Sequence, residues 1–314
     1  MKRFLSLLTL SALLFTLAAC AQKTPAQSDT PAVTPPAEAK PIELAELNVE
    51  FVKGERDAEA LLTLKKELPP LLIDALKAEG VSVDAVSVTF GASAEATAQA
   101  LAAGSVHVAF LPTSVYCAHF GEIHAVADRV GSSDSLIGLY LPYSEHNASL
   151  VEKLTSVAWE KAFSKEDLTE AQWALPALDE AAERYLSLLL EQSYDLSPDE
   201  LENVSSYSDL AERDAALKNA NFVVLYGSDA VTSPLYATLT NLPLEGETVA
   251  VTAAESQIQS EAFCTALQNA LSALCLDEAS QKVLALYSGG EFANYRAVND
   301  GTYSSQRYIL GHEE

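Results

Sequence analysis

Positively charged side chains are scarce in this sequence of 314 residues. It has 19 lysine and arginine residues against 44 aspartate and glutamate residues, which gives a formal net charge of −25 at pH 7. A nucleic-acid-binding surface needs a basic footprint that neutralises phosphates, so this composition argues against nucleic-acid binding. It also argues against adsorption to anionic lipids, and attachment to a membrane would therefore need an anchor.

Cysteine is rare as well, with four residues in the chain. Cys264 and Cys275 fall on one predicted helix, where their separation along the axis would be ~16 Å. A disulfide cannot bridge that distance, so these two side chains do not pair with each other in a helix. We expect Cys117, Cys264 and Cys275 to be free, buried thiols.

Familiar catalytic motifs are absent. The sequence contains no Gly-x-Ser-x-Gly, no His-Glu-x-x-His, no phosphate-binding loop with its lysine and no Cys-x-x-Cys. We therefore predict no enzyme, no catalytic residues and no cofactor. A metal site is an alternative, because His107, His119 and His124 together with Glu122 carry ligand types that zinc prefers. Isolated histidines are more often ordinary surface or core residues, so no metal ligand is predicted.

The first twenty residues have the three-part form of a secretory signal. Lys2 and Arg3 are positive, residues 4–17 are almost wholly apolar, and residues 17–20 read Leu-Ala-Ala-Cys. The apolar run is shorter than the ~20 residues that span a membrane. Leu-Ala-Ala-Cys resembles the lipobox of bacterial lipoproteins, which implies that Cys20 is diacylated and becomes the mature N-terminus. An ordinary signal peptide with a chance cysteine is the alternative.

Residues 21–41 are rich in Ala, Pro, Thr, Ser and Gln. Such a segment cannot bury enough apolar surface to offset its ordering entropy, so we predict a disordered tether between the anchor and a folded body. The remaining residues, 42–314, are enough for two modest domains.

Strand-like and helix-like patterns alternate along this body. This order predicts an α/β fold, in which helices cover mostly parallel sheets and ligands bind at the carboxyl ends of the strands. Strands are expected at residues 45–52, 81–90, 106–111, 125–128, 136–142, 173–175, 222–226 and 248–252. Helices are expected at 58–79 (kinked or split at Pro69-Pro70), 95–103, 179–192, 210–219, 261–273 and 278–288.

Several stretches occur in the order and at the spacing of one known family. They are residues 51–57 (FVKGERD), 90–96 (FGASAEA), 101–116 (LAAGSVHVAFLPTSVY), 167–174 (DLTEAQWA) and 292–307 (FANYRAVNDGTYSSQR). Together they resemble the phosphate/phosphite/phosphonate substrate-binding proteins of ABC importers, a type II periplasmic-binding-protein-like family.

The resemblance implies two α/β lobes that are joined by two crossing strands and close on a ligand. The first lobe would comprise residues 42–137 plus 252–314, and the second residues 138–251. Such a protein would capture a small phosphate- or phosphonate-like ligand outside the cytoplasm and deliver it to an ABC permease and ATPase complex. We expect a monomer that is attached to the membrane through the N-terminal lipid.

The expected ligand loop of the second lobe departs from the family. The family has a Ser-Thr-Ser-Gly turn at the start of a helix, where N–H groups and hydroxyls bind phosphoryl oxygens. Here residues 179–183 read Asp-Glu-Ala-Ala-Glu, Tyr207-Ser208 lies near the place of a family histidine, and Ala94 replaces a loop tyrosine. A neutral or cationic ligand, or a sensor or surface-interaction lipoprotein without transport, therefore stay open as alternatives.

Eight residues are predicted to line the ligand cleft. Tyr116 matches the family position, and Arg56 is the best candidate for a contact with a charged ligand in a chain poor in arginine. For each of the eight, a loop position that faces water is the alternative. The set is Glu55, Arg56, Ser93, Thr113, Ser114, Tyr116, Asp179 and Tyr226.

Overall fold

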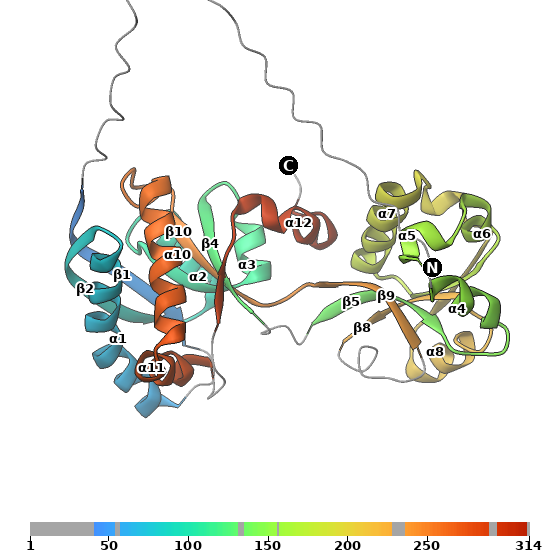
Figure 1. Ribbon diagram of the computed structural model, residues 1–314, viewed down its shortest axis with the longest axis horizontal. Coiled ribbons are helices and arrows are strands. Elements are labelled where there is room, and N and C mark those ends of the chain that lie inside the picture. Colours follow the sequence, from blue (N-terminus) through green and yellow to red (C-terminus); the bar gives the residue numbers. More distant parts are fainter. Residues whose placement is uncertain are drawn as a thin grey trace, which may run out of the picture. The chain divides into compact units, whose positions relative to one another are not determined.

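The computed structural model describes residues 41–53, 57–130, 135–155, 157–227, 236–288 and 294–312 (Figure 1). All of them belong to one unit, Pro41–Glu314. The predicted signal peptide, Cys20 and nearly all of the predicted tether lie outside the described residues, as do Glu55 and Arg56.

The first sheet has six described strands in the order β11-β4-β10-β3-β1-β2. β1 pairs in parallel with β2 and with β3, whereas the pairs of β10 and β4 are antiparallel. The strands are β1 (Ile42–Val52), β2 (Val81–Gly91), β3 (Val108–Pro112), β4 (Ile123–Arg129), β10 (Glu247–Thr252) and β11 (Tyr295–Ala297).

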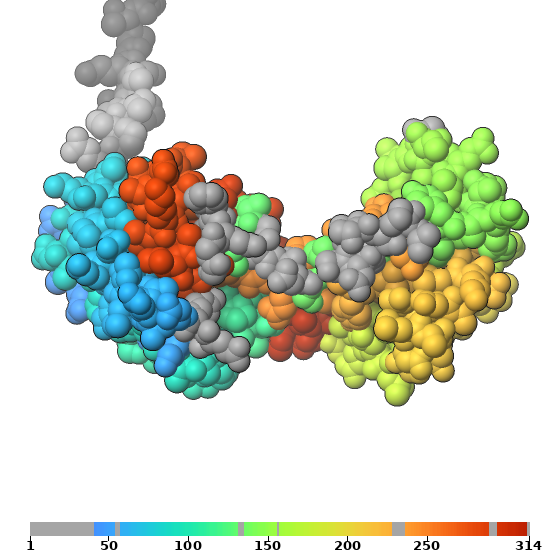
Figure 2. Space-filling view, turned by 90° about the horizontal axis from the view of Figure 1, so that it is seen from below, coloured from blue at the N-terminus to red at the C-terminus, as the bar shows by residue number. Residues whose placement is uncertain are grey.

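One face of this sheet is covered by α1 (Ala58–Ala78), α10 (Glu261–Leu276) and α11 (Glu278–Ser288), which contact one another (Figure 1). Figure 2 shows the blue surface of α1 beside the orange surface of this helix layer. The buried leucines of α1 recur every three or four residues, as an amphipathic helix requires. A kink or a split was predicted at Pro69-Pro70; the split does not occur, because one helix runs through both prolines while Leu68 and Leu72 keep the buried stripe continuous.

A second cluster of the first lobe joins α2 (Ala94–Ala102), α3 (Thr113–Ala118) and the C-terminal α12 (Ser304–Leu310). Tyr116 and Tyr303 are buried in it, and their ring centroids are 4.9 Å apart. Asp300 lies in the short 3-10 helix η2 (Asp300–Tyr303) and accepts a hydrogen bond from the hydroxyl of Tyr116.

The second sheet has five described strands in the order β7-β6-β8-β5-β9. β6 pairs in parallel with β7 and β8, and β5 is antiparallel to β8 and β9. The strands are β5 (Leu136–Pro142), β6 (Gln172–Pro176), β7 (Asn203–Tyr207), β8 (Phe222–Tyr226) and β9 (Tyr236–Pro243). The helices are α4 (Ala148–Leu154), α5 (Trp159–Ala162), α6 (Lys165–Thr169), α7 (Glu180–Tyr194), η1 (Pro198–Glu200) and α8 (Leu210–Ala216).

This lobe has its own core around Trp173, whose ring stacks on Phe222 with 4.7 Å between the centroids. The indole N–H of Trp173 donates to the carbonyl of Leu168 at 2.9 Å, so its one polar group is satisfied although the side chain is buried.

The α/β class and the two-lobed architecture that the resemblance implies are confirmed by these sheets and cores. The sheets are mixed, and most pairings among the described strands are antiparallel, so the expectation of mostly parallel strands does not hold. The second lobe was also expected to end at residue 251, whereas β10 (Glu247–Thr252) already belongs to the first sheet. β10 pairs with β3 and β4, so the chain returns to the first sheet near residues 244–246.

No helix in the described ranges is both long enough and apolar enough to cross a membrane. Cys117 and Cys275 are buried, Cys264 is half-buried, and all three are free, which confirms the expectation of unpaired thiols.

Candidate functional site

The carboxyl ends of three parallel strands of the second sheet meet at one edge. β6 ends at Pro176, β7 at Tyr207 and β8 at Tyr226, and the pairings of β6 place these ends side by side. In α/β sheets this edge is where the loops converge on ligands. Two of the predicted residues, Asp179 and Tyr226, lie there.

Asp179 is the N-cap of α7. Its Oδ1 accepts a hydrogen bond of 3.0 Å from the N–H of Ala182 and one of 2.8 Å from the hydroxyl of Tyr226. Burial of the ring and this bond to a carboxylate both raise the pKa of Tyr226, so the phenol stays protonated and remains a donor. The structure thus brings two predicted residues together around one negative charge.

More carboxylates follow the ends of β6 and β7, the two neighbouring strands at this edge. Glu180 and Glu183 lie in the first turn of α7. On the neighbouring loop, Asp209 caps α8, and Glu212 accepts the hydroxyl of Ser208 at 2.6 Å. Both helix N-termini at this edge are therefore capped by acidic side chains, which complement the helix dipoles and make the edge electronegative.

Exposed apolar side chains share the same edge. Leu178 is 100% exposed and has a φ of 55°, in the left-handed region that a leucine rarely adopts. Leu210, the first residue of α8, is 69% exposed, and Tyr226 is 36% exposed. The edge therefore offers apolar surface next to its carboxylates.

Three other predicted residues lie where β2 and β3 of the first sheet end. Ser93 caps α2 by accepting the N–H of Ala96 at 3.1 Å. Thr113 is buried and bonds to Thr248, with 3.0 Å between their hydroxyl oxygens. The N–H of Ser114 points to the carboxylate of Glu245, with 3.5 Å between N and Oε2. Sequence reasoning missed Glu245, because only the pairing of β10 with β3 brings it to this loop.

Tyr116 occupies a different environment from the one expected. Its side chain is completely buried, and its hydroxyl donates to Asp300 Oδ1 at 2.7 Å. Burial and that carboxylate raise the pKa of the phenol. Direct contact with a ligand would require the side chain to leave the core, so in the described structure Tyr116 supports the α3 loop from inside.

A polar pocket of about 380 Å³ lies where the chain returns from β9 to β10. Thr113 is the predicted residue that lines it. Glu247 is buried in its wall, where it accepts the hydroxyl of Tyr295 at 2.5 Å and lies 3.8 Å from Arg129 Nε. Asp128 forms a two-pronged ion pair with Arg296 beside it.

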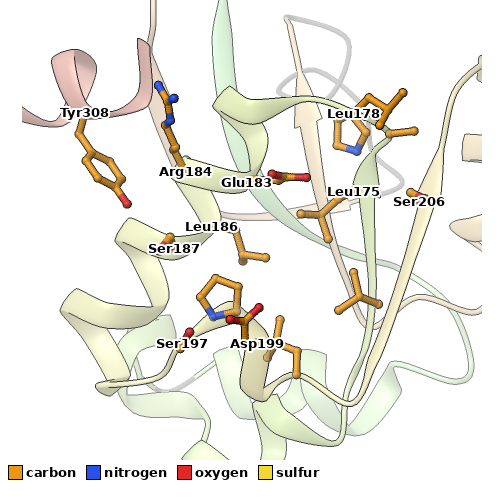
Figure 3. Close-up of a pocket in the computed structure, with 15 residues that line it drawn as sticks. Leu175, Leu178, Glu183, Arg184, Leu186, Ser187, Ser197, Asp199, Ser206 and Tyr308 are labelled. Atoms are coloured by element: carbon orange, nitrogen blue, oxygen red, sulfur yellow. The ribbon is translucent and has the colours of Figure 1, made fainter. Parts of the chain in front are cut away.

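A larger pocket, of about 740 Å³, lies in the second lobe between α7, η1 and β7 (Figure 3). Its lining combines apolar side chains such as Leu175, Leu186 and Val204 with Glu183, Arg184 and Asp199. None of the eight predicted residues lines this pocket.

The histidines of the alternative metal site lie in separate interactions. His107 Nδ1 accepts the N–H of Asn48, His124 contacts Asp300, and His119 contacts Glu95 and Glu122. Within the described ranges, no group of three or more potential ligands is arranged to hold a metal ion.

Comparison with known proteins gives structural similarity alone. No known family profile matches the chain, and no curated protein matches it in sequence. XAC2383 from Xanthomonas citri bound to ATP is similar over 85% of this chain and 96% of its own, with 11% identity and a TM-score of 0.41.

Two further solved structures are similar to a comparable extent. The binding protein component of an ABC phosphonate transporter (PA3383) from Pseudomonas aeruginosa covers 86% of this chain and 89% of its own, with 12% identity and a TM-score of 0.38. The periplasmic aliphatic sulphonate binding protein SsuA from Escherichia coli covers 85% and 91%, with 12% identity and a TM-score of 0.38. Scores of this size assign neither a ligand nor binding residues.

Proposed function

We propose that this chain is an extracytoplasmic, lipid-anchored solute-binding protein that captures a small cationic organic molecule and delivers it to an ABC permease and ATPase complex. The N-terminal lipobox-like sequence supports export and anchoring through Cys20. The two lobes, each with strand ends that converge on a loop-lined edge, support capture of a ligand.

The contact that carries the choice of ligand is that between Asp179 and Tyr226. Two donors, the N–H of Ala182 and the hydroxyl of Tyr226, hold the Asp179 carboxylate in place at the edge. A fixed carboxylate beside an aromatic ring is suited to an ammonium group, which gains both charge pairing and a cation–π contact. Exposed Leu178 and Leu210 suit an apolar part of the same molecule.

A phosphate- or phosphonate-like ligand fits the described residues less well. An oxyanion would need N–H groups at helix starts, yet in α7 that of Ala182 already donates to Asp179. In the first lobe, the N–H of Ser114 faces Glu245. At both places an anion would have to displace a carboxylate and would then be repelled by it.

Thermal-shift titration tests this proposal. The soluble protein from residue 21 onward would be titrated with primary amines, quaternary ammonium compounds, phosphate and methylphosphonate. A ligand that binds only the folded state at a hundredfold excess over Kd stabilises it by ~2.7 kcal/mol, which gives a clear rise in Tm. We expect a rise with at least one cation, and loss of that rise in Asp179→Asn.

Asp277→Asn is the matched control. Asp277 also accepts a hydrogen bond from a helix-start N–H, that of Ser280, at 2.8 Å, but it lies in the first lobe away from the strand ends. The control should keep the response to the cation. A rise with methylphosphonate that survives Asp179→Asn would overturn the proposed ligand class, and no rise with any solute would overturn capture of these solutes.

Import and sensing share this binding step and differ in the partner. Import requires that the ligand-loaded protein engages a permease, so deletion of the gene should abolish uptake of the labelled cation by the cell. Unchanged uptake together with tight binding would favour the sensor alternative.

A further inference from the structure

The C-terminal helix α12, which lies beside α3 in Figure 1, contacts both lobes. It packs against α3 of the first lobe and against α7 of the second. The chain already crosses between the lobes twice, once before β5 and once after β9. Helix α12 adds a third connection, which consists only of side-chain and backbone packing.

Several side-chain contacts attach α12 and the residue before it to the first lobe. Tyr303, immediately before α12, is buried against Tyr116, and its hydroxyl accepts a hydrogen bond of 3.1 Å from Thr248 Oγ1. Within α12, the Arg307 guanidinium lies 3.2 Å from the centroid of the Phe120 ring. Leu310 packs against the same first-lobe cluster. Three kinds of contact thus fix α12 to the lobe from which it emerges.

The second-lobe end depends on a few adjacent residues. Ile309 is 1% exposed and belongs to the core cluster of the second lobe, and Tyr308 packs against that cluster. Figure 3 shows Tyr308 and Arg184 at the rim of the larger pocket. Gly311 ends α12 with a φ of 79°, and a Cβ at this position would lie 2.1 Å from Nη1 of Arg184. Any side chain here would be strained and would displace the guanidinium.

We propose that α12 is a strap: it stays on the first lobe and docks Ile309 in the second, and this docking restrains the movement of one lobe against the other. A fully buried isoleucine must leave its apolar site before the lobes can change their arrangement. The second-lobe end is the releasing end, because Ile309 and Tyr308 hold it by apolar packing, whereas the first-lobe end adds a hydrogen bond and a cation–π contact. Strength of docking therefore sets how readily the lobes close.

Distance measurements between spin labels test the strap without any ligand. Leu62 on α1 and Glu166 on α6 are exposed and lie in different lobes, so each can be replaced by a labelled cysteine. The protein would start at residue 21 and carry Cys264→Ala, because Cys264 is the least buried of the three described thiols and would take up some label slowly during a long incubation. We expect one narrow distance distribution for this parent protein.

Ile309→Ala should abolish the single narrow distribution and introduce further distances. Gly311→Val disturbs the same docking site through the backbone and Arg184, and it should also broaden the distance distribution. This second variant keeps the proposal testable if Ile309→Ala fails to fold. Ser304→Ala, on an exposed position of α12, is the matched control and should leave the distribution unchanged. Unchanged distributions in both docking variants, with native circular dichroism, would overturn the strap. Since no solute is present, failure of the proposed function leaves this outcome unaffected.

Discussion

The hydroxyl of Tyr226 donates to the carboxylate of Asp179 across 2.8 Å, although the two residues are 47 positions apart in the chain. Tyr226 ends β8, and Asp179 follows β6, the parallel neighbour of β8. The bond therefore depends on the second sheet being assembled. A carboxylate that is held by two donors loses little conformational entropy when it binds a cation, because its orientation is already set.

Substitutions of Asp179 separate its role as a helix cap from its role as a charge. Asparagine keeps a side-chain oxygen that can accept the N–H of Ala182, whereas alanine does not. We expect Asp179→Ala to lower the free energy of unfolding by about 1 kcal/mol and Asp179→Asn to lower it less. Both should weaken binding of the cation at least tenfold, or about 1.4 kcal/mol.

Urea unfolding and titration calorimetry on the same preparations measure the two effects. If Asp179→Asn bound the cation as tightly as the parent protein, the carboxylate would not be the contact, and a role in capping alone would remain.

Much of the fold follows from local sequence patterns. The predicted strands at 136–142 and 222–226 and the predicted helix at 278–288 have the bounds of β5, β8 and α11. These segments are continuously apolar or regularly amphipathic, so their pattern does not depend on distant partners. β7, β9 and β11 were missed. β7 reads Asn-Val-Ser-Ser-Tyr, and pairing with β6, rather than its own hydrophobicity, makes it a strand.

The candidate site was predictable in part for the same reason. Ser93 and Asp179 are helix caps directly after strands, a pattern that is visible in sequence. The surroundings of Tyr116 were not predictable, because they are made by Asp300 and Tyr303, more than 180 positions later. Position within a motif places a residue on a loop, but the direction of its side chain depends on such distant contacts.

Gly91 is predicted to be intolerant of a side chain. A Cβ at the end of β2 would lie 1.9 Å from Thr97 Oγ1 and 2.6 Å from Glu50 Oε1. The Thr97 hydroxyl donates a hydrogen bond of 2.8 Å to Glu50 Oε1, and Thr97 is completely buried. These side chains therefore cannot change rotamer without losing that bond. We expect Gly91→Ala to lower the free energy of unfolding by about 1–3 kcal/mol.

A double-variant cycle checks the cause. Thr97→Ala removes the nearest atom, so Gly91→Ala should cost clearly less in that background than in the parent protein. Equal costs in the two backgrounds would show that the close approach of Thr97 does not determine the effect.

The three thiols of the folded body should resist modification. Burial raises the pKa of Cys117 to about 12 and that of Cys264 to about 11, and it also raises the pKa of Cys275. Since the thiolate is the reactive form, we expect slow reaction of the native protein with a disulfide reagent near neutral pH. Unfolding in urea should make all three react rapidly, and a rapid reaction of the native protein would contradict the described burial.

His119 links three elements of the first lobe and should make stability depend on pH. Its Nδ1 lies 2.9 Å from Glu122 Oε2, and its Nε2 lies 3.1 Å from Glu95 Oε1, at the start of α2. Burial by itself lowers the pKa of His119, but the hydrogen bonds and charges of the two glutamates outweigh it and raise the pKa above its ordinary value. The folded chain therefore holds the proton more tightly than the unfolded chain does.

The sign of the pH effect follows from this difference. The stabilisation is fully present below the unfolded pKa of ~6.5 and is lost as pH rises through the higher folded pKa. We therefore expect the urea midpoint of the parent protein to fall on going from about pH 6 to about pH 8, and we expect His119→Gln to remove that part of the fall. His312→Gln, at an exposed histidine near the C-terminus, is the matched control and should keep the parent's dependence. An identical pH dependence in His119→Gln and the parent protein would mean that the proton on His119 is not coupled to folding.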